Sequence, residues 1–269
     1  MIVALAEAVR RHCGHRFPPI GAAAFGLLFR LLPAKANVEM FPGIRVDMDF
    51  SDAIMRATYW QGDRFEKPTA QVLERWSNDA THFFDVGSNY GFFSYLLLSC
   101  RPELQVHAFE PNVATFARME FTRTSNALRC LHTWNIGLSD VAARIALHPG
   151  TDDSGHSTFG PHPELAGRSL GEVDVLPFDA WRELHGLALP DKPSWIAKID
   201  VEGFETRVVR GMADSLKARA FAGIVIEMNE FTLEFCGSSP AELRRVLRAN
   251  GYVEELVSRE SGNAFFVPA

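Results

Sequence analysis

Four acidic residues each stand at the end of a short apolar run, and this placing is the clearest chemistry that the sequence offers. Asp85 follows HFF, Glu110 follows VHAF, Asp200 follows WIAKI and Glu227 ends GIVIE. Short apolar runs of this kind are typical of strands that are covered on both faces of a parallel sheet. Because ligands bind at the carboxyl ends of such strands, we expect the four carboxylates to face one crevice.

The turn after Asp85 carries two glycines four positions apart, Gly87 and Gly91. A dinucleotide would need a G-x-G-x-x-G turn without a nearby anion, and Asp85 would repel its pyrophosphate. Asp85 suits a cationic group instead, such as an ammonium or a sulfonium. Glu110, at the tip of the next strand, can accept both hydroxyls of a ribose. A ribose and a positive charge without phosphate describe S-adenosylmethionine, which is the expected cofactor.

Each of these acids has a simpler interpretation when it is taken alone. Acidic side chains favour the N-cap position of helices, and Asp85 could serve only as such a cap. Four acids on one edge of a sheet are harder to explain in that way. The set therefore predicts a binding site rather than four separate caps.

The stretch WIAKIDVEGFE places Lys198 inside an apolar strand, where an unpaired ammonium would be costly. Lys198 therefore needs a carboxylate partner, for which Asp200, Glu202 and Glu227 are the candidates. The alternative interpretation is a structural salt bridge followed by the N-cap of the next helix. Gly203 would allow a close approach of the backbone to substrate or sheet.

The elements that must position these residues follow a regular rhythm from His82 onward. Strands are expected at His82–Val86, Gln105–Phe109, Leu131–Ile136, Trp195–Ile199 and Gly223–Glu227. Helices are expected at Phe92–Cys100, Val113–Asn126, Phe204–Leu216 and Pro240–Asn250. This order predicts an α/β fold with a parallel sheet, right-handed crossovers and flanking helices.

The regions around this repeat have their own patterns. Before it, NVEMFPGIRVDMDF predicts a hairpin around Pro42-Gly43, and KPTAQVLERW predicts a helix. After it, GYVEELVSRESGNAFFVPA predicts a closing antiparallel hairpin. Between the third and fourth strands, residues 148–175 are rich in Gly, Pro, His and Asp. A long loop of this kind in a compact domain is usually functional.

Composition limits the class of protein. The 269 residues are 47% hydrophobic and 22% charged, which is typical of a globular chain. The net charge of −6 does not favour a nucleic-acid partner, which normally needs a basic surface. The four cysteines lie far apart without a CxxC pair, which favours reduced thiols in a cytoplasmic protein.

The N-terminal residues 1–36 are expected to form a helical extension, and residues 37–269 the main domain. Arginines, a short apolar segment and the triplet Ala34-Lys35-Ala36 loosely resemble a secretory signal, but Arg30 interrupts the apolar segment. The alternative is an amphipathic helix over Ile20–Leu32 that packs on the domain or rests on a membrane surface. No apolar run approaches the roughly 20 residues needed to cross a bilayer. We therefore expect a cytoplasmic protein, with membrane association through this helix as a second hypothesis.

Five segments together resemble one known family. FFDVGSNYGFFS, AFEPN, GLSD, IAKIDVEGFE and IVIEMN occur in this order and are similar to the FkbM family of S-adenosylmethionine-dependent methyltransferases. The similarity extends from Phe41 to Val257, and Ser88 departs from it because alanine is commoner there. It implies a class I methyltransferase (Rossmann-like) fold, with a mostly parallel seven-stranded sheet flanked by helices. It also implies O-methylation of hydroxyls on sugars, glycolipids or polyketide-type molecules.

The same resemblance implies a cofactor site made of loop residues. The methionine end would be shaped by Asp85, Gly87, Ser88, Asn89 and Gly91. The ribose would lie at Glu110, with Pro111 and Asn112 shaping its loop, and the adenine near Leu138 and Ser139. A family element that closes over the cofactor would include Glu66 and Thr69.

Methyl transfer from a sulfonium is an in-line displacement, so most of the rate can come from alignment and exclusion of water. A sugar hydroxyl is a poor nucleophile, and the candidates for a base are Asp200, Glu227 and His156. Magnesium is the rival mechanism, because Asp200, Glu202, Glu227 and Asn229 offer oxygen ligands. These residues do not have a tight ligand spacing such as D-x-D, so a divalent cation is not favoured and no metal site is expected.

Two other functions remain as alternatives at this point. One is a nicotinamide-dependent oxidoreductase on a similar sheet, and the other is a non-catalytic binding protein that retains the fold. The aromatic residues Tyr59, Trp60 and Phe65 could stack on a sugar ring or could be core contacts. The sequence does not identify the acceptor or the oligomeric state.

Overall fold

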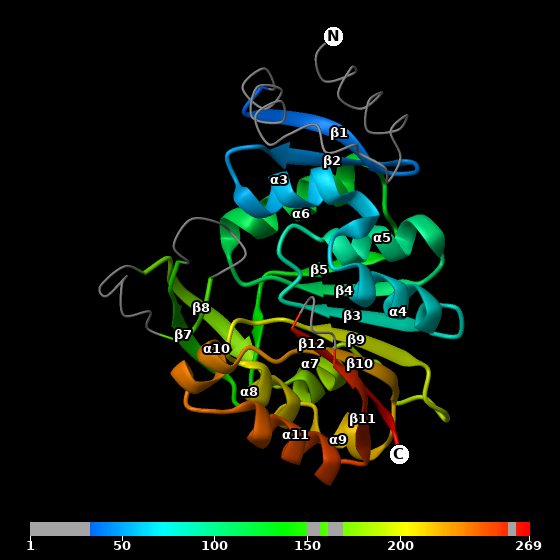
Figure 1. Ribbon diagram of the computed structural model, residues 1–269, viewed down its shortest axis with the longest axis vertical. Coiled ribbons are helices and arrows are strands. Elements are labelled where there is room, and N and C mark those ends of the chain that lie inside the picture. The colour runs from blue at the N-terminus through cyan, green and yellow to red at the C-terminus, as the bar shows by residue number, and fades with distance from the viewer. Residues whose placement is uncertain (1–32, 150–156, 161–168, 258–261) are drawn as a thin grey trace.

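The computed structural model describes residues 33–149, 157–160, 169–257 and 262–269. A seven-stranded sheet forms its centre, in the order β11-β12-β10-β9-β3-β4-β5 (Figure 1). Its strands are β3 (His82–Val86), β4 (Gln105–Phe109), β5 (Leu131–Trp134), β9 (Trp195–Ile199), β10 (Phe221–Glu227), β11 (Tyr252–Val257) and β12 (Asn263–Pro268). The first five run parallel, and β12 pairs antiparallel with β10 and β11. The expected class I methyltransferase sheet with its closing hairpin is confirmed.

Helices cover both faces of this sheet (Figure 1). One face packs against α4 (Lys67–Ser77), α5 (Phe92–Cys100) and α6 (Val113–Ser125), and the other against α7 (Phe178–Leu184), α8 (Glu205–Arg210), α9 (Ala213–Lys217) and α11 (Pro240–Ala249). Because successive side chains of a strand point to opposite faces, Phe83 joins the first core and Phe84 the second. Burial on both sides explains why these strands read as apolar runs.

The third strand is shorter than expected. It ends at Trp134, and Gly137–Leu138 form β6 of a separate three-stranded sheet. In that sheet β8 (Gly171–Leu176) pairs with β6 in parallel and with β7 (Ala143–Leu147) antiparallel. Part of the stretch expected to be one long loop, residues 148–175, is therefore a strand. Its residues 150–156 and 161–168 lie outside the described part of the chain.

The helix expected over Phe204–Leu216 is two helices, α8 and α9. The chain bends at Gly211, where an added Cβ would lie 2.0 Å from the carbonyl oxygen of Ser139. A side chain at this position cannot fit, so the bend brings the backbone against the loop after β6. A further helix that was not predicted, α10 (Glu230–Phe235), follows β10 and begins at the N-cap Asn229.

The hairpin before the main sheet is confirmed. It consists of β1 (Lys35–Phe41) and β2 (Ile44–Asp49), with Gly43 at φ +75° in the turn. Two elements that were not predicted follow it, α3 (Ala53–Gln61) and the 3₁₀ turn η1 (Gly62–Arg64). Asp52 caps α3 by accepting the N–H of Met55 at 2.9 Å.

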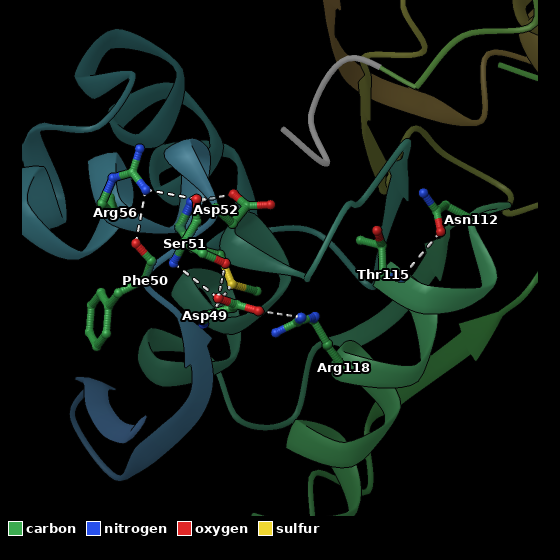
Figure 2. A network of polar contacts seen from close by, with 9 residues as sticks. Asp49, Phe50, Ser51, Asp52, Arg56, Asn112, Thr115 and Arg118 are labelled. Carbon is green, nitrogen blue, oxygen red and sulfur yellow. Dashed lines mark hydrogen bonds and ion pairs between the residues drawn. The ribbon is translucent and has the colours of Figure 1, made fainter. Parts of the chain in front are cut away.

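A polar network attaches this N-terminal region to helix α6 of the main domain (Figure 2). Asp49, at the end of β2, accepts a hydrogen bond from Arg118 of α6 at 2.6 Å. The other oxygen of Asp49 accepts the backbone N–H of Ser51 at 3.0 Å. Arg56 of α3 donates to the carbonyl oxygens of Phe50 and Ser51 at 2.9 and 2.7 Å. The junction between β2 and α3 is therefore held from both sides.

The N-terminal extension expected over residues 1–36 lies outside the described residues apart from its last four positions, and so does the helix expected at Ile20–Leu32. Within the described ranges, no helix has the length and apolar character needed to cross a membrane.

Candidate functional site

One pocket opens at the carboxyl ends of β3, β4, β9 and β10. Asp85, Glu110, Asp200 and Glu227 all line it, so the expected convergence of the four strand-end acids is observed. The wall also includes Ile54, Thr58, Phe65, Glu66, Val86, Gly87, Ser88, Asn89, Tyr90, Phe92, Phe93, Phe109, Pro111, Ile136, Gly137, Leu138, Leu147, Ser157, Phe159, Lys198, Val201 and Glu202. Carboxyl groups outnumber ammonium groups in this wall six to one among the described residues. The pocket therefore suits a positively charged ligand.

The turn between β3 and α5 forms the floor of the pocket. Asp85 is 1% exposed and accepts a hydrogen bond from the hydroxyl of Ser94 at 2.6 Å. Burial raises the pKa of Asp85, and the ammonium of Lys198 opposes this rise. At Gly87, φ is +78° and an added Cβ would lie 1.8 Å from the carbonyl oxygen of Asp200. Glycine is therefore required there for the β3 and β9 loops to meet.

Glu110 links the ends of β3 and β4. Its carboxylate accepts the N–H of Asn89 at 2.9 Å and that of Asn112 at 2.8 Å, one on each oxygen. Burial raises the pKa of Glu110 to about 7, although both backbone hydrogen bonds lower it. Each carboxylate oxygen has a further lone pair, so Glu110 can still accept hydroxyl groups from a ligand.

Lys198 of β9 is paired with the carboxylate that directly follows its own strand. Its ammonium lies 2.6 Å from a carboxylate oxygen of Asp200 and 4.8 Å from the centroid of the Phe93 ring. Burial disfavours the ammonium, but the charges of Asp200, Glu66 and Asp85 outweigh that effect and raise the pKa of Lys198. The expected carboxylate partner is therefore Asp200, and Lys198 stays charged.

A second carboxyl group lies beside this ion pair. Ligand oxygens of Asp200, Glu202 and Glu227 all lie within 4.8 Å of one another. Burial, followed by the negative charges of Asp200, Glu202 and Glu205, raises the pKa of Glu227 to about 10. Glu227 is thus protonated at neutral pH. That protonation weakens it as a base and leaves Asp200 the stronger candidate.

The same three carboxyl groups are the oxygen donors that a magnesium ion prefers. Asn229, the fourth ligand considered from the sequence, does not join them. Its side-chain oxygen accepts the N–H groups of Phe231 and Thr232 at 3.1 and 3.4 Å and caps α10. A cluster of carboxyl groups is common without a metal, and no metal role is assigned to this one.

Glu66 enters the pocket from the N-terminal region. Its backbone has φ +42°, a left-handed conformation that is uncommon for a residue with a side chain. Its carboxylate accepts a hydrogen bond from Asn263 of β12 at 2.8 Å. The same amide group donates to the hydroxyl of Thr69 at 2.9 Å. Thr69 is fully buried and not part of the wall, so it supports Glu66 through Asn263.

Three other residues of the expected cofactor set lie outside the wall. Gly91 has φ +98° at the N-cap of α5, and Asn112 caps α6 by accepting the N–H of Ala114 at 3.0 Å. Ser139 is fully buried. His156, the third candidate for a base, lies outside the described residues.

The helix α3 supplies wall residues that the sequence analysis missed. Ile54 and Thr58 both line the pocket, and the hydroxyl of Thr58 hydrogen-bonds to that of Tyr90. The signal available in the sequence was Asp52, an N-cap residue directly before the helix. Of the three aromatic residues considered for a sugar platform, Phe65 lines the pocket, whereas Tyr59 is fully buried in the core.

Comparisons with known proteins agree with this arrangement. The family model for the methyltransferase FkbM domain matches residues 85–254. The hexuronic acid methyltransferase AglP of Haloferax volcanii is 27% identical over 189 residues, which cover 68% of each chain.

Several solved structures match the chain at low sequence identity, with TM-scores below 0.5. The methyltransferase domain of METTL16 gives a TM-score of 0.47 at 14% identity and covers 100% of this chain and 79% of that one. A SAM-dependent methyltransferase from Agrobacterium tumefaciens gives 0.43 at 8% identity, with 87% and 70% covered. TYW2 of M. jannaschii, solved in complex with AdoMet, gives 0.41 at 13% identity, with 88% of each chain covered.

Proposed function

Because the chain belongs to the FkbM methyltransferase family, we propose that it methylates a hydroxyl group of a sugar or of a sugar-containing lipid. As a member of this family the chain is an S-adenosylmethionine-dependent methyltransferase. The two alternatives considered from the sequence, a nicotinamide-dependent oxidoreductase and a non-catalytic binding protein, are therefore set aside. The observation that carries the proposal is the single pocket that Asp85, Glu110 and Asp200 line together, from the ends of β3, β4 and β9. The relative AglP, a hexuronic acid methyltransferase, supports a sugar acceptor.

The cofactor side of the pocket fits S-adenosylmethionine, which when bound supplies a methyl group on a positively charged sulfur. Glu110 accepts the ribose hydroxyls while its oxygens keep the N–H groups of Asn89 and Asn112. Asp85, which is buried, and Glu66, which is half-buried, offset the positive charges of the ligand, and charge interactions are strong away from water. Pro111 and Leu138 supply apolar surface.

On the acceptor side, Asp200 takes the proton of the attacking hydroxyl. Its ion pair with Lys198 fixes the direction of its carboxylate. Glu227, which carries a proton at neutral pH, can donate a hydrogen bond to an oxygen of the acceptor. Ile54 and Phe65 add apolar wall that helps to exclude water from the reaction.

The test is transfer of labelled methyl groups from S-adenosylmethionine to a panel of a neutral glycoside, a glucuronide and a glycolipid, with mass spectrometry of the products. We expect an O-methyl sugar, and an Asp200→Asn variant that is slower by about 100-fold while its affinity for S-adenosylhomocysteine stays within about threefold. Transfer only to acceptors without a sugar, or full activity in this variant, would overturn the proposal.

The same assay separates the base mechanism from a metal mechanism. If Asp200 acts as a base, turnover is unchanged by EDTA. If EDTA abolishes turnover and Mg²⁺ restores it, the carboxyl groups of Asp200, Glu202 and Glu227 act as metal ligands instead.

A further inference from the structure

The loop between β9 and α8, residues 201–204, follows Asp200 directly and has an unusual backbone. Glu202 has φ +51° and Gly203 has φ +106°, both in the left-handed region. An added Cβ on Gly203 would lie 2.3 Å from the carbonyl oxygen of Thr232 in α10. Such conformations persist only where the surrounding structure holds them. The loop therefore needs an identifiable support.

A buried carboxyl group supplies one part of that support. Glu205, the first residue of α8, is 0% exposed. One of its oxygens accepts the N–H of Val201 at 3.0 Å and that of Gly203 at 3.1 Å. From the opposite side, the hydroxyl of Thr158 donates to the carbonyl oxygen of Glu202 at 2.7 Å. The loop is thus held between Glu205 and Thr158, with Glu202 in the middle.

Glu205 does not reach the pocket itself. It is absent from the pocket wall, although Asp200, Val201 and Glu202, which precede it in the chain, all belong to that wall. Its second oxygen is buried and has no hydrogen-bond partner among the described residues, which is costly for a carboxyl group. Burial of this carboxyl group is unfavourable, and its two hydrogen bonds to Val201 and Gly203 both go to the β9–α8 loop. Its effect on the pocket is therefore exerted through that loop.

We propose that Glu205 is a positioning residue for methyl transfer: its carboxyl group holds the β9–α8 loop so that Asp200 and Glu202 face the acceptor. The inference rests on the proposed function for its effect on turnover. Its effect on the loop can be measured without any acceptor.

The experiment compares Glu205→Ala, Glu205→Asp and Glu205→Gln in the full chain. Asp keeps the charge but is one methylene too short to reach both N–H groups, whereas Gln keeps an oxygen in the same place. Asp179→Ala is the matched control, because Asp179 also accepts two backbone N–H groups, from Asp214 at 2.8 Å and Ser215 at 3.1 Å, outside the pocket. The readouts are amide exchange of residues 201–203, affinity for S-adenosylhomocysteine, and kcat and KM on the best acceptor.

We expect exchange of residues 201–203 to rise at least about tenfold in the Ala and Asp variants of Glu205 and to stay near wild type in the Gln variant. In the same two variants kcat falls by about 100-fold, because a small displacement of a reacting group has a large effect on rate. Affinity for S-adenosylhomocysteine stays within about threefold, because Asp85 and Glu110 are on other loops. The Asp179 control loses stability but keeps its loop exchange and kcat.

Unchanged exchange in the Ala and Asp variants of Glu205 would overturn the inference. So would a kcat within about threefold of wild type in these variants, or a Gln variant as slow as the Ala variant. If the wild-type protein methylates no sugar at all, the proposed acceptor class fails, and the exchange of residues 201–203 still decides the role of Glu205.

Discussion

Single residues in the pocket are held in protonation states that differ from those in water. Burial raises the pKa of Glu110 to about 7 and that of Glu227 to about 10. Both carboxyl groups were expected from the sequence only as acids at strand ends. A ligand that brings positive charge or hydroxyl donors favours their ionised forms, so its binding is linked to pH.

Binding of S-adenosylhomocysteine should therefore strengthen as pH rises through 7. Glu110 accepts ribose hydroxyls best when it is ionised, and its pKa in the free protein is about 7. Ligand binding lowers that pKa, so affinity should increase by about tenfold between pH 6 and pH 8. Calorimetric titration across this range checks the slope. A Glu110→Gln variant should bind more weakly with a flatter profile, and an equally steep profile would assign the pH dependence to another group.

Gly87→Ala tests the contact between the β3 and β9 loops. Its Cβ would lie 1.8 Å from the carbonyl oxygen of Asp200, so the free energy of unfolding should fall by at least about 2 kcal/mol and cofactor affinity with it. Gly43→Ala is the matched control. Gly43 has a similar φ of +75°, but an added Cβ there would meet no atom of the described residues within 4 Å. Urea denaturation measures both. Equal losses in the two variants would mean that φ alone, and not the contact with Asp200, explains the requirement.

Among the elements, β3, β4 and β5 carry a row of histidines across the sheet. The ring of His107 stacks on that of His82 at 5.6 Å and on that of His132 at 4.9 Å. Trp181 of α7 covers His107 edge-on at 5.2 Å. The Nδ1 atom of His107 is buried and has no hydrogen-bond partner in the part of the chain that the structure describes. Burial, followed by the charges of the neighbouring histidines, lowers the pKa of His107 to about 3.

This row predicts loss of stability in mild acid. Between pH 3 and 6.5 the folded protein holds His107 neutral while the unfolded chain binds a proton, so stability falls as pH falls. One such histidine contributes up to about 1.4 kcal/mol per pH unit. A His107→Phe variant should therefore show a shallower decline between pH 6.5 and pH 4 in thermal or urea unfolding. His82→Phe, at one end of the row and less buried than His107, should have a smaller effect, and an unchanged slope in both variants would contradict the assignment.

The whole molecule completes its pocket with chain segments from outside the region matched by the FkbM model. Ile54, Thr58, Phe65 and Glu66 line the wall and precede residue 85. Asn263 of β12, which holds Glu66, follows residue 254. The N-terminal hairpin and α3 are attached through the contact between Asp49 and Arg118 (Figure 2). Cofactor binding and the docking of this region should therefore be coupled.

Arg118→Met should loosen that attachment. Asp49 would remain buried without its cation, so the free energy of unfolding should fall by about 1–3 kcal/mol and the affinity for S-adenosylhomocysteine should weaken. The control is Arg123→Met on the same helix, where the ion pair is local to Glu120 and partly exposed and should contribute less than about 0.5 kcal/mol. Urea unfolding and calorimetry compare the two. Equal stability losses, or intact affinity in Arg118→Met, would show that the attachment does not shape the pocket.

The sequence by itself determined the α/β class, the strands that end in Asp85, Glu110, Asp200 and Glu227, and the family. These features depend on short-range patterns, because apolar runs, helix signals and the DVEGFE motif are each contained within about a dozen residues. Burial of the strands on two faces follows from the same pattern. The prediction of one helix over residues 204–216 was wrong. The helix is interrupted at Gly211, where the backbone lies against Ser139 of another loop, and a local pattern does not contain that contact.

Only the tertiary structure decided which polar groups meet. Asn263 lies 197 positions from Glu66, and Thr158 lies 44 positions from Glu202, so no local pattern predicts either pair. The structure also directs Asn112 and Asn229 to helix caps, although both had been considered as ligand-binding residues. The elevated pKa of Glu227 arises from burial and from like charges that only the folded chain brings together. Which polar groups form hydrogen bonds depends on their distance in space. That distance is set by how the sheet and its helices pack.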